Sequence, residues 1–410
     1  MTQTLKARDA KDVENAVQWA LGNEKTLEII GHGSKRAIGR PLQVDMTLDL
    51  SGLAGVTLYE PEELVLTAKA GTPLAEIEML LGARGQRLAF EPMDCAALFG
   101  APVGRGTIAG TVAANLSGPR RPSAGAARDH LLGFTAVSGR GEVFKSGGRV
   151  VKNVTGYDLC KLMAGSWGTL AALTEVTVKT LPKPETEATV VLSGLDDRAG
   201  VAAMVAAMGS SCDVCGAAHL PAATAARFPM GEAVGGGRSL TALRLEGVAP
   251  AVAQRLAALV AALRPHGEPT TVDDMVSRRL WAAIRDVTAF ASNRGSADVP
   301  LWRISTAPAS GHELVATVAR AAEAQALYDW GGGLIWLLVP DAPAAAAGAV
   351  RAAVGTLGGH ATLIRAPAAL RSSIEPFEPQ PAGLAALTKR VKQGFDPKSV
   401  LNPSRMWAGV

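Results

Sequence analysis

The stretch from residue 149 to 181 constrains the fold of this chain more than any other. A short helical pattern at 159–163 leads into a turn of glycine and hydroxyl residues at 164–169, and a strand-like run then ends at Leu181. Glycines in such a turn allow close approach of the backbone to a ligand, and hydroxyl groups offer hydrogen bonds to it. The pattern predicts a helix, a turn and a strand that form one wall of a site for a large polar molecule.

A second glycine turn follows the first predicted strand. An apolar face at helical spacing predicts a helix that begins at Asp9, and residues 26–30 follow as a strand. Gly31-His32-Gly33-Ser34-Lys35 comes directly after this strand. Such a turn presents several free N–H groups on a concave surface, which favours an anion such as phosphate. Further strands are expected at 44–50, 56–59, 64–68 and 87–90, and Thr72 is expected to cap a helix that ends near Ala83.

A third segment, residues 100–125, is the richest in glycine and small residues. The spacing Gly104-x-Gly106-x-x-Ala109 matches a dinucleotide fingerprint, but no apolar strand precedes it and Gly118-Pro119 breaks the following helix. A Rossmann site is therefore not expected here. The Gly165-Ser166-Trp167-Gly168 turn also differs from a hydrolase elbow, because it follows a helix and precedes a strand.

After Pro184 the sequence alternates alanine-rich helices with short strands, and the order recurs after residue 300. Two such halves predict an antiparallel sheet covered by helices. The C-terminal segment holds a basic helix followed by Phe395-Asp396-Pro397 and by Leu401-Asn402-Pro403.

Composition excludes several classes of protein. The net charge of +4 in 410 residues is too small and too dispersed for a nucleic-acid-binding protein. The N-terminus lacks the apolar segment of a signal peptide, and prolines interrupt the most apolar stretch, 333–350. We therefore expect a cytoplasmic protein without an integral membrane segment, which a partner could still hold at the inner membrane.

The four cysteines include one C-x-x-C, Cys212 to Cys215. This pair could be redox-active or half of a metal site, but no second pair at metal-ligand spacing accompanies it. Small residues in a half-buried strand are the favoured interpretation. Neither an iron–sulfur centre nor another metal site is expected in this chain.

The glycine turns and the C-terminal tail, in this order, resemble the FAD-binding PCMH-type module of the vanillyl-alcohol oxidase and p-cresol methylhydroxylase family. The resemblance covers about residues 1–185 and the tail. Within the family, the run GGRVVKNVTGYDL at 147–159 is most similar to the flavin subunits of glycolate oxidase, also called glycolate dehydrogenase. The resemblance implies an α+β protein: an FAD-binding domain of two α/β subdomains at 1–184, a shortened antiparallel-sheet cap at 185–380, and a C-terminal helix and tail at 381–410 that return to the FAD domain.

The resemblance further implies a non-covalent FAD. Some relatives attach the flavin through a histidine in the first loop, but Ser34 occupies that place in the Gly-x-Gly-Ser register and His32 comes two residues early. The residues that the resemblance assigns to the cofactor fall in the loops and on the strand after 165–169. They are Gly31, His32, Gly33, Ser34, Lys35, Ile38, Gly39, Arg40, Pro41, Pro92, Gly106, Thr107, Gly110, Thr111, Asn115, Ser117, Gly118, Gly125, Gly165, Ser166, Gly168, Thr169, Glu175 and Val176.

No catalytic residue can be assigned from the sequence. Relatives that oxidise D-2-hydroxy acids share a C-terminal histidine cluster, whereas His219, His266, His312 and His360 are scattered here without ligand spacing. The resemblance therefore implies a flavin subunit of a glycolate-oxidising complex, which acts as an electron relay or holds a structural flavin. In that complex a paralogous flavoprotein subunit oxidises the small 2-hydroxy acid, and an iron–sulfur subunit passes electrons to a membrane or quinone acceptor.

Three alternatives stay open at this point. The chain could be a stand-alone FAD-dependent 2-hydroxy acid dehydrogenase, with Arg120, Arg121 and Arg128 as candidate carboxylate anchors. It could be a reductase of the UDP-N-acetylenolpyruvoylglucosamine type, which shares the FAD module. It could also be a non-catalytic scaffold that a flavin stabilises.

Overall fold

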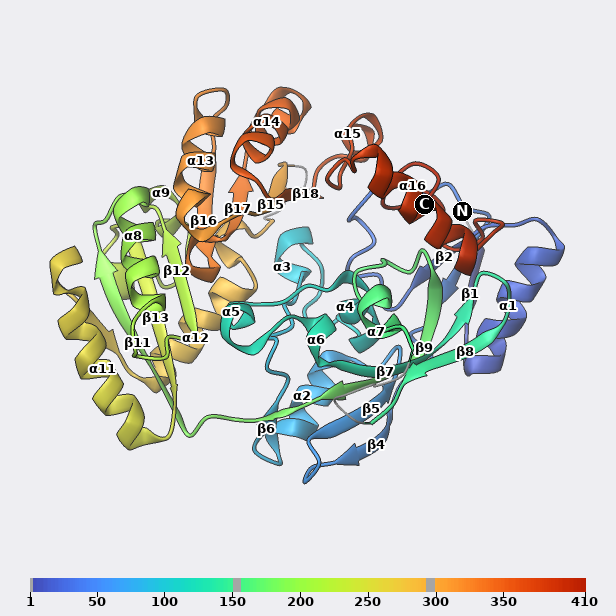
Figure 1. Cartoon of the computed structure of the whole chain (residues 1–410), viewed down its shortest axis with the longest axis horizontal. Helices are drawn as coiled ribbons and strands as arrows, with labels where there is room; N and C mark the ends of the chain where they lie inside the picture. The colour runs from blue at the N-terminus through green and yellow to red at the C-terminus, as the bar shows by residue number, and fades with distance from the viewer. Residues whose placement is uncertain (1–2, 150–155, 293–298) are drawn as a thin grey trace.

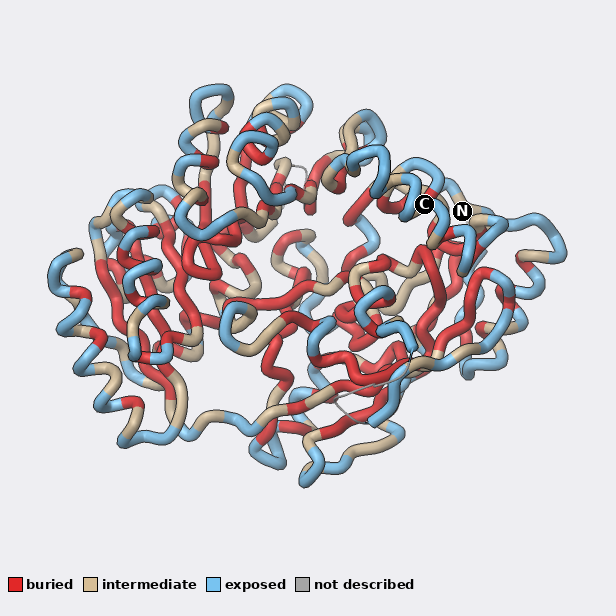
Figure 2. Tube along the Cα trace, viewed as in Figure 1, coloured by how far each residue is buried: buried red, intermediate tan, exposed pale blue. Residues whose placement is uncertain are grey.

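The computed structural model of the chain describes residues 3–149, 156–292 and 299–410. Residues 150–155, in the middle of the predicted GGRVVKNVTGYDL motif, lie outside these ranges. Figure 1 shows the small sheets of the N-terminal half on one side and a large sheet with its helices on the other. In Figure 2 the buried residues follow the strands of these sheets, and the outer helices carry most of the exposed residues.

The N-terminal segment forms a small parallel sheet. Helix α1 (Ala10–Gly22) begins where the Asp9 side chain accepts a hydrogen bond from the amide of Asp12, which confirms the predicted start. Its apolar face packs against the sheet and against Leu401 of the tail. The three strands, in spatial order, are β1 (Gln3–Lys6), β3 (Met46–Asp49) and β2 (Leu27–Ile30).

A five-stranded antiparallel sheet follows. Its core includes Val176 and Val178 together with residues of three short helices that are given with their bounds at the end of this paragraph. In spatial order the strands are β4 (Val56–Glu60), β5 (Val65–Lys69), β9 (Ala171–Lys179), β7 (Leu131–Ser138) and β8 (Val143–Gly147). The short helices of this half are α2 (Leu74–Gly82), α3 (Ala96–Phe99), α4 (Ile108–Ala114), α5 (Arg121–Ala124), α6 (Ala127–His130) and α7 (Leu159–Met163).

The second half is built on an eight-stranded sheet whose neighbouring strands are all antiparallel, which confirms the predicted architecture. In spatial order the strands are β14 (Thr270–Val272), β11 (Thr186–Ser193), β13 (Leu240–Gly247), β12 (Gly216–Leu220), β16 (Gln325–Asp329), β17 (Leu334–Leu338), β15 (Leu301–Ser305) and β18 (His360–Arg365).

The two faces of this sheet have different neighbours. One face packs on α8 (Asp197–Met208), α11 (Ala249–Leu263), α13 (Gly311–Ala319) and α14 (Ala347–Leu357). The core on the other face combines Trp281 of α12 (Asp274–Arg285) and Trp336 of β17 with residues of the N-terminal half, including Ala114 and Trp167. Two very short helices, α9 (Ala222–Ala225) and α10 (Gly231–Gly235), complete this half.

Two connections join the halves. Strand β10 (Leu181–Pro182) pairs with β6 (Gln86–Arg87) just before the chain enters the large sheet. After the large sheet, α15 (Ala368–Ser373) and α16 (Ala382–Phe395) lead back to the N-terminal half. There Leu401 forms an isolated parallel bridge with Leu27 of β2, and the two termini lie on the same side of the molecule (Figure 1).

Several local predictions were wrong. Helix α2 has Pro73 as its N-cap, because the Thr72 hydroxyl bonds instead to the carbonyls of Lys69 and Gly55. The helical pattern at 159–163 predicts Leu159, Leu162 and Met163 on one face, but Leu162 is 36% exposed, and the buried residues of α7 are Cys160 and Met163. The strand expected over 87–90 covers only Gln86–Arg87, because the chain pairs only briefly with β10 there.

Among the residues that the structure describes, none of the helices combines the length and the apolar character required to cross a membrane.

Candidate functional site

The turn after β2 leaves its main-chain donors free. Within the described chain, the amides of residues 31–35 donate no hydrogen bond to another group. The turn closes only afterwards, where the amide of Arg36 donates to the carbonyl of Gly33 and the amide of Ile38 donates to that of Lys35. A run of unpaired amides at the end of a strand is a concave anion-binding surface.

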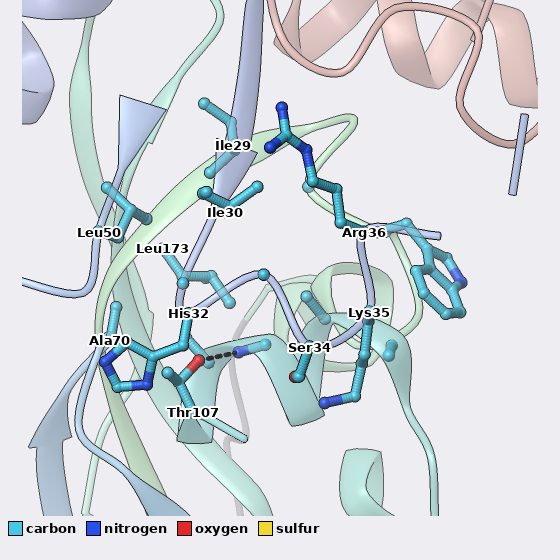
Figure 3. A pocket seen from close by; sticks show the side chains of 18 of the residues that line it. Ile29, Ile30, His32, Ser34, Lys35, Arg36, Leu50, Ala70, Thr107 and Leu173 are labelled. Atoms are coloured by element: carbon cyan, nitrogen blue, oxygen red, sulfur yellow. Dashed lines mark hydrogen bonds between the residues drawn. The ribbon is translucent and has the colours of Figure 1, made fainter. Parts of the chain in front are cut away.

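The second loop lies directly against this turn. A Cβ atom placed on Gly31 would come within 2.6 Å of Thr107 Oγ1, so only glycine allows the two segments to approach this closely. Thr107 begins α4, and its hydroxyl accepts a 3.3 Å hydrogen bond from the amide of Gly110 (Figure 3). The predicted first and second loops are thus brought side by side.

The third loop, at 165–169, is attached to α4 by its own backbone. The amide of Gly165 donates to the carbonyl of Val112, and the amide of Trp167 donates to that of Ala113 at 2.9 Å. Trp167 has a φ of 54°, a left-handed conformation that a large side chain adopts only where the surroundings hold it. Here the hydrogen bonds on either side of the residue supply that restraint.

The C-terminal tail fastens the first loop to the third. The Asn402 side chain accepts a hydrogen bond from the amide of Ile29 and donates one to the carbonyl of Trp167, each 2.8 Å long. Lys392 of α16 is 1% exposed and donates to Asp396 and to the carbonyls of Thr169 and Leu401. The tail therefore holds segments from distant parts of the sequence in one arrangement.

These loops enclose a cavity, called here the loop cavity. Its floor and walls combine backbone of the three loops with apolar side chains from β2 and β9 (Figure 3). The lining residues are Ile29, Ile30, Gly31, His32, Gly33, Ser34, Lys35, Arg36, Leu50, Ala70, Thr107, Ala109, Gly110, Ala113, Ala114, Trp167, Gly168, Ala171, Leu173 and Arg405.

The loop cavity carries positive charge that the chain does not neutralise. Arg36 is paired with Glu28, but within the described chain neither Lys35 nor Arg405 forms an ion pair with a carboxylate. Arg405 donates to the carbonyl of Lys35 at 2.8 Å, and its guanidinium lies 5.6 Å from the ring centre of Trp167. Burial lowers the pKa of Arg405 to about 10, so the side chain stays charged at neutral pH.

Some buried polar atoms at this site lack a partner. Within the described chain, His32 Nδ1 and Arg405 Nε, both from lining residues, are buried without a hydrogen bond. An unpaired buried polar group usually costs about 1–3 kcal/mol. Together with the free amides, these atoms fit a large polar ligand that supplies the missing hydrogen bonds.

The structure separates the predicted cofactor residues into groups. Those that line the loop cavity are Gly31, His32, Gly33, Ser34, Lys35, Thr107, Gly110 and Gly168, while Asn115 and Gly165 line a second, adjoining cavity. The other predicted loop residues are not among the lining residues of either cavity: Ile38, Gly39, Arg40, Pro41, Gly106, Thr111, Ser117, Gly118, Gly125, Ser166 and Thr169.

Three predicted residues lie elsewhere. Glu175 accepts a hydrogen bond from Thr57 in a separate depression of the five-stranded sheet. Val176 is buried in the core of that sheet. Pro92 lines a different depression beside Glu91.

The second cavity, called here the sheet cavity, has a volume of about 480 Å³. It shares Ala114 and Trp167 with the loop cavity, so the two are neighbours. Its other walls come from β15, β18 and the segments around α16. They include Asn115, Leu116, Gly165, Arg303, Gly359, His360, Thr362, Ile364, Phe377, Glu378, Pro379, Gln380, Pro381, Leu384, Met406 and Trp407.

An ion-pair network joins the two halves behind these cavities. Arg244 of β13 donates to both carboxylate oxygens of Glu91 at 2.9 Å. Arg120 pairs with Glu91 at 2.7 Å and also with Glu246. Burial alone would raise the pKa of Glu91, but the guanidinium groups of Arg244 and Arg120 hold it below the ordinary value. Arg120 is therefore occupied, whereas Arg121 stacks on the Trp330 ring at 4.4 Å.

Sequence reasoning missed Arg405, Trp167 and the apolar walls as lining residues. Arg405 follows the predicted Leu-Asn-Pro segment by two residues, but its distance in sequence from Lys35 gave no signal of their contact. The sequence pattern predicts Trp167 only as part of a turn. Its place in the cavity wall is set by the backbone hydrogen bonds that hold this turn against α4.

Comparison with known proteins agrees with the geometry. Residues 2–147 match the family model described as FAD binding domain. The glycolate oxidase subunit GlcE of Escherichia coli (strain K12) is 32% identical over 393 residues, which cover 96% of this chain and 95% of that subunit. The glycolate oxidase subunit GlcD of Bacillus subtilis (strain 168) is 33% identical over 134 residues, but these cover only 33% of this chain and 27% of that subunit.

Solved structures share the fold. The structure of p-cresol methylhydroxylase with substrate bound has a TM-score of 0.71 at 13% identity, covering 98% of this chain and 88% of that one. An alkyldihydroxyacetonephosphate synthase has a TM-score of 0.66 at 16% identity, covering 98% and 77%. The family, the fold and the FAD cofactor predicted from the sequence are confirmed: the chain belongs to the PCMH-type FAD-linked oxidoreductases, in the family of the glycolate oxidase subunit GlcE.

Proposed function

We propose that this chain is the GlcE-type flavin subunit of a glycolate-oxidising complex and holds one FAD non-covalently in the loop cavity. The free amides of residues 31–35 carry this proposal, because these residues line a cavity that also holds the cations Lys35 and Arg405. Main-chain donors and unneutralised cations together suit a pyrophosphate.

The remaining features of the loop cavity fit the same cofactor. The apolar side chains of Ile29, Leu50 and Leu173 give flat surfaces for ring systems, and the buried unpaired atoms give polar contacts. Bound FAD would supply the redox chemistry, while the chain orients it and excludes water. The proposed contacts are the lining residues of the three loops together with Arg405.

Non-covalent attachment follows from the first loop. Ser34 stands at the position where a histidine would bond the flavin, and a serine hydroxyl does not supply an equivalent nucleophile. Figure 3 shows the His32 ring beside Ala70. We assign His32 to a role in the wall of the cavity.

We further propose that the flavin of this subunit relays electrons or stabilises the subunit, and that a GlcD-type subunit oxidises the substrate. The support comes from the sheet cavity. Among the described residues that line it, the one carboxylate is Glu378, which is paired with Arg351 and accepts a hydrogen bond from the amide of Ala361, so it is not free to act as a base. In this proposal an iron–sulfur subunit receives the electrons, and the complex associates with the inner membrane through its partners.

A stand-alone dehydrogenase is the second candidate. Of the arginines predicted as carboxylate anchors, Arg120 is committed to Glu91 and Glu246, and Arg128 is exposed. Arg121 is the one of the three that lies over Trp330, whose ring Arg303 of the sheet cavity also contacts.

Steady-state turnover separates the two candidates. The purified chain should be assayed with glycolate and an artificial electron acceptor, alone and after co-expression with its GlcD-type and iron–sulfur partners. The proposal expects a flavin-containing chain that is inactive alone and an active complex. Turnover by the chain alone would overturn the relay role and favour the stand-alone enzyme.

A further inference from the structure

Helix α16 carries an apolar face that continues beyond the core on which it packs. Val391 and Phe395, in the last two turns of the helix, pack against the core of the five-stranded sheet. Leu384 and Leu387 continue the same face at helical spacing, but they are 49% and 48% exposed. Apolar side chains that lie exposed next to each other favour contact with another protein.

The end of the chain lies beside this face. Figure 1 shows the C-terminus next to α16, and a Cβ atom placed on Gly409 would come within 4.0 Å of the Lys389 side chain. Trp407 is half-buried and lines the sheet cavity together with Leu384. We call this surface the tail patch, and its residues are Leu384, Leu387, Lys389, Arg390 and Trp407.

Three aromatic rings connect the tail patch with the loop cavity. Trp167 lines the loop cavity, and its ring packs edge-on against Phe377 with 5.6 Å between the ring centres. Phe377 contacts Trp407 of the tail patch, with 5.8 Å between these two centres. The indole N–H of Trp407 donates to the carbonyl of Glu378 at 2.8 Å, which fixes the outer ring. A partner on the tail patch would therefore be linked to the loop cavity through packed side chains.

This position suits the relay role in the proposed function, on which the inference rests. In a relay, the iron–sulfur cluster of the partner takes the two electrons of a reduced flavin one at a time, and water takes its two protons. The rate of electron tunnelling falls steeply with distance, so the acceptor has to dock close to the flavin. The chain of Trp167, Phe377 and Trp407 gives the tail patch this closeness.

The charge of the tail patch favours an acidic partner. Lys389 and Arg390 are exposed, and within the described chain neither of them forms an ion pair, whereas Lys392 of the same helix is paired with Asp396. Glu378, beside Trp407, is already paired with Arg351. Exposed leucines next to unpaired cations match a partner surface with an apolar centre and carboxylates at its rim.

We propose that the tail patch is the docking surface for the electron-accepting iron–sulfur subunit, and that this subunit presents an apolar contact rimmed by carboxylates. Leu384 and Leu387 supply the apolar contact, and Lys389 and Arg390 select the acidic rim. A lipid surface fits less well, because Val391 and Phe395 hold the rest of the apolar face of α16 against the core.

Binding of the purified iron–sulfur subunit to the immobilised, flavin-containing chain tests the docking surface. The Kd is measured by biolayer interferometry, with and without the GlcD-type subunit. The double variant Leu384→Asp/Leu387→Asp should raise the Kd at least tenfold, because it places charges in an apolar contact. The matched control is Val205→Asp/Met275→Asp, which introduces the same charges at exposed apolar positions of α8 and α12 and should bind like the wild type.

A second pair of variants tests the charge of the tail patch. Lys389→Met/Arg390→Met should raise the Kd about fivefold at low salt and make it less sensitive to ionic strength. Arg198→Met/Arg320→Met removes the same charge from exposed positions at α8 and at the end of α13. This control should keep the affinity and the salt dependence of the wild type.

Flavin content and Tm are measured on every variant and should not change. If Leu384→Asp/Leu387→Asp loses flavin, Leu387→Asp alone takes its place with the same expectation, since Leu387 is not among the lining residues of either cavity.

Three results would overturn the inference: no binding of the iron–sulfur subunit to the wild type under either condition, equal affinity of the leucine variant and the wild type, or a leucine variant that loses only the GlcD-type subunit or self-association. A chain without flavin that still loses the iron–sulfur subunit in the leucine variant would contradict the proposed function and leave the docking surface intact.

Discussion

The loop cavity and the sheet cavity share Ala114 and Trp167 as lining residues, but they differ in which groups can donate hydrogen bonds. In the loop cavity the donors are main-chain amides, and the C-terminal tail fixes their positions through Asn402 and Lys392. In the sheet cavity the main donor is one side chain, Arg303, which tryptophan rings hold in place.

This difference determines which changes each cavity tolerates. A site of backbone amides depends on close approach between segments, so added Cβ atoms and loss of the tail contacts should damage it. The guanidinium in the sheet cavity is held by contacts with tryptophan rings and not by backbone hydrogen bonds between loops, so a substitution of this one side chain should have little effect on the fold. The predictions below test this contrast, from the largest expected effect to the smallest.

Loss of the buried tail contact should have the largest effect. Lys392→Met leaves Asp396 buried without its partner and removes donors to the carbonyls of Thr169 and Leu401. Breaking such a pair typically costs about 3–5 kcal/mol of stability. The measurement is urea denaturation together with flavin content. Lys389→Met, at an exposed position on the same helix, is the matched control. Equal stability of the two variants would show that the tail does not organise the loop cavity.

A side chain placed between the first two loops should weaken FAD binding. Gly31→Val places atoms where even a Cβ would lie 2.6 Å from Thr107 Oγ1. Steric strain of about 1–3 kcal/mol corresponds to an affinity lower by roughly 5- to 150-fold. The Kd for FAD added to deflavinated protein is the measurement. Gly22→Ala, where nothing lies within 4 Å of the new Cβ, should bind FAD like the wild type. Unchanged affinity of Gly31→Val would place FAD elsewhere.

Removal of the tail cation should have a smaller effect on the same equilibrium. Arg405→Met eliminates one charge at the loop cavity and the hydrogen bond to the Lys35 carbonyl. Since the main-chain donors remain, we expect the affinity for FAD to fall by about tenfold, or ~1.4 kcal/mol. Arg405→Lys keeps the charge and should recover part of the loss. A Kd that does not change in Arg405→Met would remove this residue from the proposed site.

Asp329, a buried carboxyl whose charge interacts with Arg303 of the sheet cavity, should make the stability of the chain depend on pH. Burial raises the pKa of Asp329 to about 7. In the unfolded chain the pKa of an aspartate is about 3.9. The folded state therefore retains a proton that the unfolded state loses, and stability falls as pH rises from about 4 to about 7. Asp329→Asn does not titrate, so it should gain stability relative to the wild type across this window, by at most about 1.4 kcal/mol per pH unit.

Urea denaturation between pH 4 and pH 8 measures this difference. The advantage of Asp329→Asn should stop growing above about pH 7, where the folded carboxyl is also ionised. A difference that stays constant with pH would contradict the burial of a titrating carboxyl beside Arg303.

The same contrast explains what could be predicted from the sequence. The loop cavity is made of contiguous segments whose glycines and hydroxyls stand next to each other, so Gly31–Lys35 and 165–169 were recognisable before the structure was known. The large antiparallel sheet was also predictable, because its strands alternate with helices along the chain.

The sheet cavity gave no such signal. Arg303 and His360 meet only because β15 and β18 are neighbours in the sheet, and Glu378 reaches the cavity from the segment between α15 and α16. Arg405 escaped prediction for the same reason. Thr72 illustrates the opposite error: its local pattern suggested a helix cap, but its hydroxyl donates instead to the carbonyl of nearby Lys69 and to that of Gly55, 17 residues away.

The central claim is that the loop cavity holds a non-covalent FAD, and an absorption spectrum before and after acid precipitation tests it most directly. The account predicts a flavin spectrum for the native protein at about one FAD per chain, with the yellow colour in the supernatant after precipitation. A colourless native protein would contradict the proposed cofactor site, and a yellow pellet would contradict the non-covalent attachment inferred from Ser34.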